Sequence, residues 1–439
     1  MASPSAPHTP RFTVDVFQNE YLAEGAREVN AIVTVSAAGT GLAGGAGDGP
    51  AAAVVIMIDC SGSMDSPASK MRNAREATAA AVDTLRDGVA FAVVAGTHEA
   101  AEVYPGDGRL AVADDATRAG AKQALRRLSP LGGTAIGTWL ALARRLFDSR
   151  PDIAIRHGIL LTDGRNEHEK PADLQRVLDE AAGRFTVDCR GVGTDWEVAE
   201  LQRISAALLG TVDIVAEPAD LADDFRAMMA AAMDKQVADV ALRLWTPVGA
   251  EVAYVKQVAP EVQDLTGRRT EAGPRAGDYP TGSWGDESRD YHVCLKVPAA
   301  AVGDEMLAAR ISLVHPQPGG TAGVLSQGLV RAVWTDDLAS STRIDRQVAH
   351  YTGQAELASS VQEGLAAHRA GDLDRATAKL GAAVRLARAT GNDATFRLLQ
   401  KVVDVVDAEE GTVRFRKDVS EADSMTLETR STKTVRVKR

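Results

Sequence analysis

The residues best suited to chemistry follow an apolar run in the first sixth of the chain. The run, residues 53–58, ends at Asp59, and Ser61 and Ser63 follow at alternate positions. Carboxylate and hydroxyl oxygens are hard ligands, which suit Mg²⁺ or Mn²⁺ better than zinc. The segment therefore predicts a loop that binds a divalent metal ion.

Two later segments carry oxygen donors of the same kind. Residues 131–134 form a glycine turn that ends at Thr134, and a second apolar strand, residues 158–162, ends just before Asp163. In an open parallel sheet, loops that are distant in sequence converge beyond the carboxyl ends of adjacent strands. We therefore expect a single site formed by Asp59, Ser61, Ser63, Thr134 and Asp163.

This order of residues resembles the metal-ion-dependent adhesion site of the von Willebrand factor type A (VWA) domain, which reads D-x-S-x-S, then Thr, then Asp. The resemblance covers residues 48–235. It implies that Ser61, Ser63 and Thr134 bind the metal directly, and that Asp59 and Asp163 anchor it through water. A carboxylate of a partner protein then completes the coordination. Ser63 is followed by Met64, Asp65 and Ser66, so the adjacent second metal site of some integrin domains is not expected.

Each part of this pattern has a simpler explanation. Ser61 or Ser63 is a favourable N-cap for the helix predicted over residues 67–86. Asp163 followed by Gly164 is a common turn pair. All of these features in the order of the family favour the metal site.

Bulk properties restrict the class of protein. The chain has 439 residues, enough for two or three domains, and a net charge of −11, which argues against binding to nucleic acid. The three cysteines lie far apart, which predicts free thiols in a reducing compartment. Residues 1–10 lack the basic start and apolar core of a signal peptide, and no apolar run approaches the roughly 20 residues of a membrane span. These features predict a cytoplasmic protein.

The patterning predicts an α/β fold with additions on either side. Residues 48–235 alternate apolar strands with amphipathic helices, as in a doubly wound, mainly parallel sheet. Residues 237–345 carry short alternating segments that predict an antiparallel β-sandwich. Residues 11–37 alternate in the same way, and we expect them to join that sandwich. The VWA domain is then inserted into or flanked by the sandwich, similar to integrin β-subunit headpieces, and residues 38–50 supply a flexible linker.

The C-terminal part predicts a small α-helical region. Residues 350–410 form three amphipathic stretches separated by glycines, and residues 366–376 weakly resemble a tetratricopeptide repeat. Residues 416–439 are polar and without apolar periodicity, which predicts a disordered tail. Its hydroxyl groups are candidate kinase targets, at Thr426, Thr429, Ser431, Thr432 and Thr434.

Catalysis is not expected. A haloacid-dehalogenase-type site needs a second Asp at the position of Ser61, and a hydrolase elbow needs G-x-S-x-G. His157 and His168 flank Asp163, but we expect His157 to open a strand and His168 to lie in an exposed charged loop. The prediction is a divalent-metal-dependent protein-binding scaffold or adaptor. The alternatives are a metal-dependent hydrolase and a structural VWA domain with an unused site. The resemblance implies an AAA+ ATPase or a kinase and phosphopeptide-binding system as partner.

Overall fold

The computed structural model describes residues 10–39, 52–315 and 322–437. These residues form two compact units. The α/β unit lies between residues 42 and 238, and the sandwich unit consists of residues from both sides of it in the sequence. Most of the linker predicted over residues 38–50 lies outside the described residues.

The α/β unit contains a seven-stranded sheet with the order β10-β9-β8-β4-β5-β6, and β7 also pairs with β5. The pairs that join β4, β5, β8, β9 and β10 are parallel, whereas β6 and β7 run antiparallel to β5. The strands are β4 (Ala52–Asp59), β5 (Ala90–Gly96), β6 (Ala100–Tyr104), β7 (Ala111–Val112), β8 (Ile155–Thr162), β9 (Thr186–Val192) and β10 (Val212–Val215). The predicted doubly wound, mainly parallel sheet is therefore confirmed.

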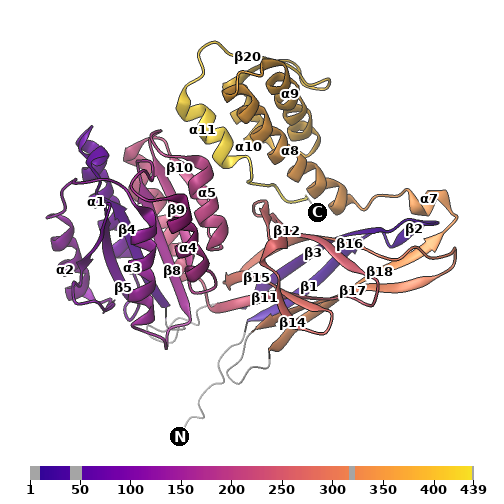
Figure 1. The fold of residues 1–439 in the computed structure, drawn as a ribbon, viewed down its shortest axis with the longest axis horizontal. Coiled ribbons are helices and arrows are strands. Elements are labelled where there is room, and N and C mark those ends of the chain that lie inside the picture. Colours follow the sequence, from indigo (N-terminus) through magenta and orange to yellow (C-terminus); the bar gives the residue numbers. More distant parts are fainter. Residues whose placement is uncertain (1–9, 40–51, 316–321, 438–439) are drawn as a thin grey trace, which may run out of the picture. The chain divides into compact units, whose positions relative to one another are not determined.

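Helices cover both faces of this sheet (Figure 1). They are α1 (Ser69–Thr84), α2 (Asp115–Leu125), α3 (Ile136–Asp148), α4 (Pro171–Ala181), α5 (Val198–Ala207) and α6 (Leu221–Met233). Every residue of β4 is buried, since side chains on both of its faces meet helices. On one face Ile56 packs with Ala77 of α1 and Phe225 of α6. The small alanines of α1 let that helix lie close to the sheet.

The sandwich unit has two mainly antiparallel sheets that contain strands from the start of the chain, and the short strand β2 pairs in parallel with β18. One has the order β1-β3-β16-β12-β13 and the other β14-β15-β11-β17-β18-β2. The first strands are β1 (Arg11–Gln18), β2 (Tyr21–Ala23) and β3 (Glu28–Ala38). The later ones are β11 (Val237–Trp245), β12 (Glu251–Ala259), β13 (Gln263–Asp264), β14 (Thr270–Gly273), β15 (Ala276–Trp284), β16 (Glu287–Lys296), β17 (Glu305–His315) and β18 (Gly323–Thr335). Because β3 pairs with both β1 and β16, the α/β unit is an insertion between strands of one sandwich.

Buried tryptophans fill the sandwich. Trp284 is fully buried, packs edge-on against Phe12 of β1 and donates its indole N–H to Thr281 Oγ1 at 2.9 Å. Trp334 of β18 donates to the carbonyl of Ala26 at 2.9 Å. Each large apolar ring therefore also has a partner for its polar atom, and both rings contact residues of the N-terminal segment.

Helices follow the sandwich: α7 (Leu338–Ser341), α8 (Arg346–Arg369), α9 (Leu373–Ala389), α10 (Asp393–Val402) and α11 (Glu421–Arg430). Gly371 and Gly391 have positive φ after α8 and α9, and Asp372 and Asn392 then cap the next helices. The region predicted as helical over 350–410 also contains a strand, β19 (Val403–Asp407), which forms a hairpin with β20 (Thr412–Phe415). Short alternating strands between helices gave too weak a signal to be recognised.

The prediction of a disordered tail over residues 416–439 is wrong for the described part. Ser420 caps α11, which buries Met425 and Leu427. After the helix, the carbonyl of Thr432 accepts from Val262 N at 2.8 Å, and Thr434 Oγ1 donates to the carbonyl of Val258 at 2.7 Å. A single helix of ten residues with two well-buried apolar side chains shows little periodicity, so its order comes from tertiary contacts. Among the described residues, no helix is both long and apolar enough to cross a bilayer.

Candidate metal site

The site lies at the carboxyl ends of β4 and β8, which are neighbouring parallel strands. Asp59 ends β4, and Asp163 directly follows Thr162, the last residue of β8. The loop after β4 is joined to the glycine turn by two backbone hydrogen bonds, from Gly62 N to the Gly132 carbonyl at 2.9 Å and from Leu131 N to the Cys60 carbonyl at 2.7 Å. These bonds bring the serine loop and the Thr134 loop to the same edge of the sheet.

Three of the predicted ligands form a continuous chain of oxygen atoms. The Ser61 and Ser63 hydroxyl oxygens are 2.9 Å apart, and Ser63 Oγ donates to Asp163 Oδ1 at 2.6 Å. A Cβ atom at Gly164 would lie 3.2 Å from Ser63 Oγ and 3.7 Å from Thr134 Oγ1, so the absence of a side chain there leaves space between these hydroxyls. Ser63 is exposed, whereas the other four predicted ligands are buried. The hydroxyls of Ser63 and Thr134 therefore both border the space at Gly164.

Asp59 is fixed by hydrogen bonds to both carboxylate oxygens. Ser61 N donates to Oδ1 at 2.8 Å and Thr162 Oγ1 donates to Oδ2 at 2.6 Å. Burial has the largest effect on the pKa of Asp59 and raises it to about 6, against the hydrogen bonds from Ser61 and Thr162, which lower it. A divalent cation beside this carboxylate would favour its ionised form.

Lys70, in the first turn of α1, was not recognised in the sequence. Its ammonium group donates to Asp163 Oδ2 at 2.7 Å and lies 3.4 Å from Asp195 Oδ2. Burial lowers the pKa of Lys70, but the hydrogen bonds and charges of Asp163 and Asp195 outweigh it and raise that pKa above its ordinary value. A lysine seven residues after Ser63 is an ordinary helix residue in the sequence, so only the fold shows that it meets Asp163.

His168 holds the Thr134 loop. Its backbone N–H donates to the Thr134 carbonyl at 3.0 Å, and its Nδ1 accepts from Thr134 N at 3.2 Å. A Cβ atom at Gly133 would lie 2.2 Å from the His168 ring, so the turn needs glycine at this contact. His168 is exposed, as predicted, but its hydrogen bonds with Thr134 also place it beside the candidate site.

Residues close to His168 cap the start of α3. The N-cap residue of that helix, Ala135, makes no side-chain cap hydrogen bond. Asn166 Oδ1 accepts from Ile136 N at 2.8 Å, and Glu169 Oε1 accepts from Gly137 N at 2.8 Å.

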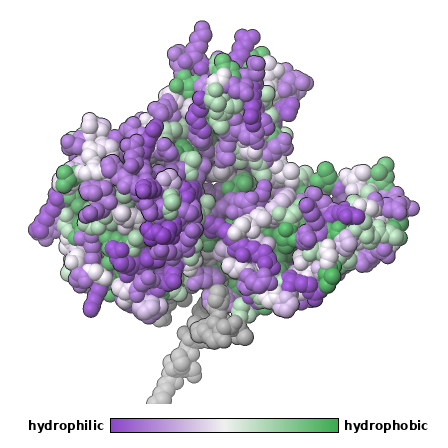
Figure 2. Space-filling view, in the orientation of Figure 1, coloured by the Kyte–Doolittle hydropathy of each residue, from purple (hydrophilic) through white to green (hydrophobic). Residues whose placement is uncertain are grey.

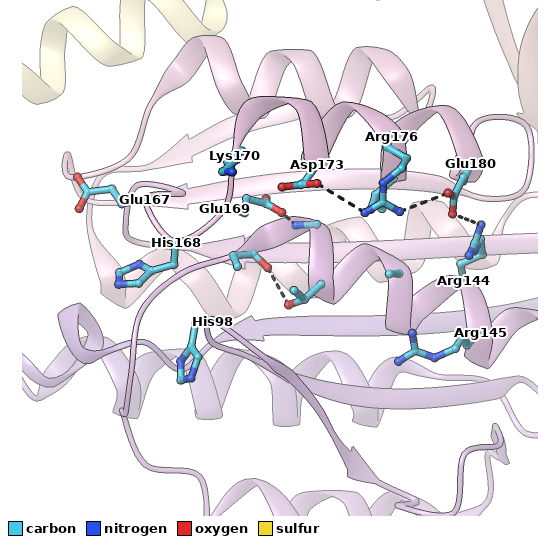
Figure 3. Close-up of a pocket in the computed structure, with 15 residues that line it drawn as sticks. His98, Arg144, Arg145, Glu167, His168, Glu169, Lys170, Asp173, Arg176 and Glu180 are labelled. Atoms are coloured by element: carbon cyan, nitrogen blue, oxygen red, sulfur yellow. Dashed lines mark hydrogen bonds and ion pairs between the residues drawn. The ribbon is translucent and has the colours of Figure 1, made fainter.

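A groove of about 750 Å³ lies between α3 and α4, with His98 and His168 at one end and Arg144 at the other (Figure 3). The surface over α3 and α4 is largely hydrophilic on the face shown in Figure 2.

His157 lies away from the site. It is five residues before Thr162 on β8, a distance of about 16 Å at the rise of a strand. Its Nε2 atom is 3.1 Å from Asp188 Oδ2.

Within the described ranges, no three His, Cys, Asp or Glu side chains are grouped so that they could hold a metal. A metal at this edge of the sheet would therefore need hydroxyl donors as well as the two carboxylates.

Comparisons with known proteins agree with this fold. A model of the von Willebrand factor type A domain matches residues 52–214, and a model of the von Willebrand factor type A C-terminal domain matches residues 385–431. A solved structure, von Willebrand factor type A from Catenulispora acidiphila, is 52% identical, covers 99% of both chains and has a TM-score of 0.93. The chain belongs to the von Willebrand factor type A family. Domains of this family commonly mediate metal-dependent protein interactions and are generally not enzymes.

Two relatives of lower sequence identity give less information about this chain. The ArnB paralog VWA2 from Sulfolobus acidocaldarius is 13% identical with a TM-score of 0.55, and covers 96% of this chain and 98% of its own, which shows a shared fold. The uncharacterized protein sll0103 of Synechocystis is 28% identical over 219 residues. That match covers 48% of this chain and 49% of the relative, so it spans about half the length of that protein.

Proposed function

We propose that this protein binds a protein partner through a divalent metal held at the edge of the α/β sheet. The metal would be held by Asp59, Ser61, Ser63, Thr134 and Asp163. Bound there, Mg²⁺ or Mn²⁺ would supply a coordination position for an Asp or Glu carboxylate of the partner. The observation that carries the proposal is the chain of oxygens from Ser61 through Ser63 to Asp163, next to the space left by Gly164.

The residues around this chain support binding over hydrolysis. His157 lies at the other end of β8, and the Nδ1 atom of His168 accepts a hydrogen bond from the Thr134 backbone. Neither histidine flanking Asp163 is therefore placed as a general base, which would have to reach the proton that it removes. An adhesion role needs only the donors, the metal and an open coordination position.

The family resemblance gives the first partners to test, an AAA+ ATPase and a kinase or phosphopeptide-binding system. We also infer a reducing, cytoplasmic environment. Cys60, Cys189 and Cys294 are all buried free thiols, which is usual where disulfides do not form.

Metal binding is tested first, on the full-length protein with Ser61→Ala and with Ser205→Ala as a matched control. Ser205 is a buried serine of α5 whose hydroxyl donates to the Gln202 carbonyl at 3.1 Å, in the same unit but outside the site. Mg²⁺ in tenfold excess over its dissociation constant should stabilise the wild type by about 1.4 kcal/mol. Calorimetric titration should show the same binding in Ser205→Ala and none, or much weaker binding, in Ser61→Ala.

Partner binding is tested by capture from lysate on immobilised wild type, Ser61→Ala and Ser205→Ala. A true partner is retained by the wild type and the control in Mg²⁺. It is lost both on chelation and on Ser61→Ala. A partner that stays bound in excess chelator would refute the adhesion mechanism even if the protein binds the metal.

A further inference from the structure

We propose that the ammonium group of Lys70 competes with the divalent metal for Asp163. When the metal binds, Lys70 moves to Asp195. This inference rests on the metal-binding function proposed above. It adds a residue that sets how tightly the metal binds, and hence at which metal concentration the protein can engage a partner.

The position of Lys70 carries the first step. Its ammonium group donates to Asp163 Oδ2 at 2.7 Å, while Ser63 Oγ donates to the other oxygen, Oδ1, at 2.6 Å. The Asp163 side chain is fully buried and that of Lys70 is only 11% exposed. A long, strongly hydrated side chain is thus withdrawn from water and held on one ligand of the proposed site.

Charge explains why a cation belongs there. Asp59 and Asp163 are both fully buried at the same edge of the sheet, and the charge of Asp163 disfavours the ionised form of Asp59. Lys70 supplies a positive charge that compensates Asp163. A divalent ion between the same donors compensates both carboxylates, but it is repelled by an ammonium group a few ångströms away. Lys70 and the metal therefore compete for the Asp163 carboxylate, and binding of one weakens binding of the other.

Asp195 gives Lys70 a second position. Its Oδ2 atom lies 3.4 Å from the ammonium group, and its side chain is 70% exposed, on the solvent side of the pair. A small movement of Lys70 toward Asp195 would release Asp163 and keep one ion pair. Asp195 should therefore lower the cost of displacing Lys70, and its effect on metal binding should depend on Lys70 being present.

The experiment is a double-mutant cycle on the full-length protein with Lys70→Met, Asp195→Asn and the double variant. Lys122→Met is the matched control, because Lys122 of α2 forms a 2.6 Å ion pair with Asp83 in the same unit but outside the site. Mg²⁺ and Mn²⁺ are titrated at constant ionic strength, by calorimetry and by the melting temperature as a function of metal concentration.

We expect Lys70→Met to bind Mg²⁺ at least tenfold more tightly than the wild type. Its metal-free melting temperature should fall, because Asp163 loses its counter-charge, and its gain in melting temperature with metal should be larger. Asp195→Asn should weaken binding about threefold in the wild type and less than 1.5-fold in the Lys70→Met background. An effect of Asp195→Asn that persists without Lys70 would mean that Asp195 acts on the metal directly, and would overturn its assigned role.

Equal or weaker metal binding by Lys70→Met would overturn the competition and make Lys70 a residue that positions Asp163. If Lys70→Met does not fold without metal, Lys70→Gln, which keeps a hydrogen-bond donor without the charge, must bind more tightly instead. The two proposals fail separately. If the wild type binds metal and Lys70→Met or Lys70→Gln binds no tighter, only the role of Lys70 is wrong, whereas no binding by any variant refutes the metal site as well.

Discussion

The hydroxyl of Thr162 donates to Asp59 Oδ2 at 2.6 Å, and these two residues end the neighbouring parallel strands β8 and β4. Both side chains are fully buried. Thr162→Val keeps the shape of the side chain but leaves one Asp59 oxygen without its donor. A hydrogen bond to a charged group contributes about 1.5–3 kcal/mol, and the lower end of that range corresponds to a rise of about tenfold in the dissociation constant for Mg²⁺, which we expect here.

Thr78→Val is the control for that measurement. Thr78 is also a fully buried threonine of the α/β unit, but its hydroxyl donates to the Ala74 carbonyl within α1, at 2.8 Å. Calorimetric titration should give wild-type metal affinity for Thr78→Val. Equal affinities for wild type and Thr162→Val would show that Asp59 does not need this bond to reach the metal.

His168 should matter for metal binding although it is exposed. His168→Ala removes the Nδ1 acceptor of Thr134 N and the ring that packs on Gly133, so the Thr134 loop should loosen. We expect a three- to tenfold loss of Mg²⁺ affinity. His168→Asn can present an acceptor oxygen near the same N–H and should lose less. If His168→Ala binds metal as the wild type does, the Thr134 loop does not depend on the contacts of His168.

The sequence predicted the candidate ligands at this edge of the sheet but not the residues that contact them, for a physical reason. Asp59 and Asp163 are recognisable because each follows a buried apolar strand, and the order of the serines and Thr134 matches a known motif. Lys70, Thr162 and His168 act through contacts between segments some 34 to 103 residues apart. Such contacts leave no local pattern in a single sequence.

In the fold, too, elements with a local sequence pattern could be predicted and those held by long-range contacts could not. The parallel strands could be predicted because burial on both faces requires continuous apolar runs. The segment from α11 to residue 437 could not, because its order depends on bonds to distant parts of the chain. One example is His350 Nε2, which lies 2.7 Å from the Val435 carbonyl.

Asp290 joins three separate segments of the sandwich unit. It is 3% exposed and accepts from Thr34 Oγ1 at 2.6 Å and from Tyr351 OH at 2.5 Å, and Arg436 Nε lies 3.4 Å away. Asp290→Asn should destabilise the unit by about 2–3 kcal/mol, since charge-assisted hydrogen bonds are lost in a buried place. Limited proteolysis should then cut the segment around Arg436 faster.

Asp278→Asn is the comparison for Asp290→Asn in denaturant unfolding. Asp278 forms a two-point ion pair with Arg243 in the same unit, but both side chains are more exposed, at 21% and 28%. Its loss should cost about 1 kcal/mol or less. Equal effects of the two substitutions would mean that Asp290 does not tie the segments together.

His292 should make the sandwich unit less stable in mild acid. Burial lowers the pKa of His292 to about 4 from its ordinary value of 6.5, helped by the charge of Lys256 and opposed by Glu28. The ring is 4% exposed, and its Nε2 atom lies 2.9 Å from Asn30 Oδ1 and 3.2 Å from the Tyr254 hydroxyl. The folded state therefore holds the neutral ring while the unfolded chain takes up a proton.

The direction of the pH effect follows from this difference. Above pH 6.5 the ring is neutral in both states, so His292 makes no contribution to the pH dependence. Between pH 6.5 and 4 the unfolded state binds more protons, so the free energy of unfolding should fall by up to about 1.4 kcal/mol per pH unit, and by about 2 kcal/mol between pH 7 and pH 5. Below pH 4 both states are protonated and the loss is complete. His292→Gln should remove this part of the slope in denaturant unfolding, whereas His315→Gln, on β17 of the same unit, should keep it. An unchanged slope in His292→Gln would show that His292 titrates alike in the folded and unfolded chain.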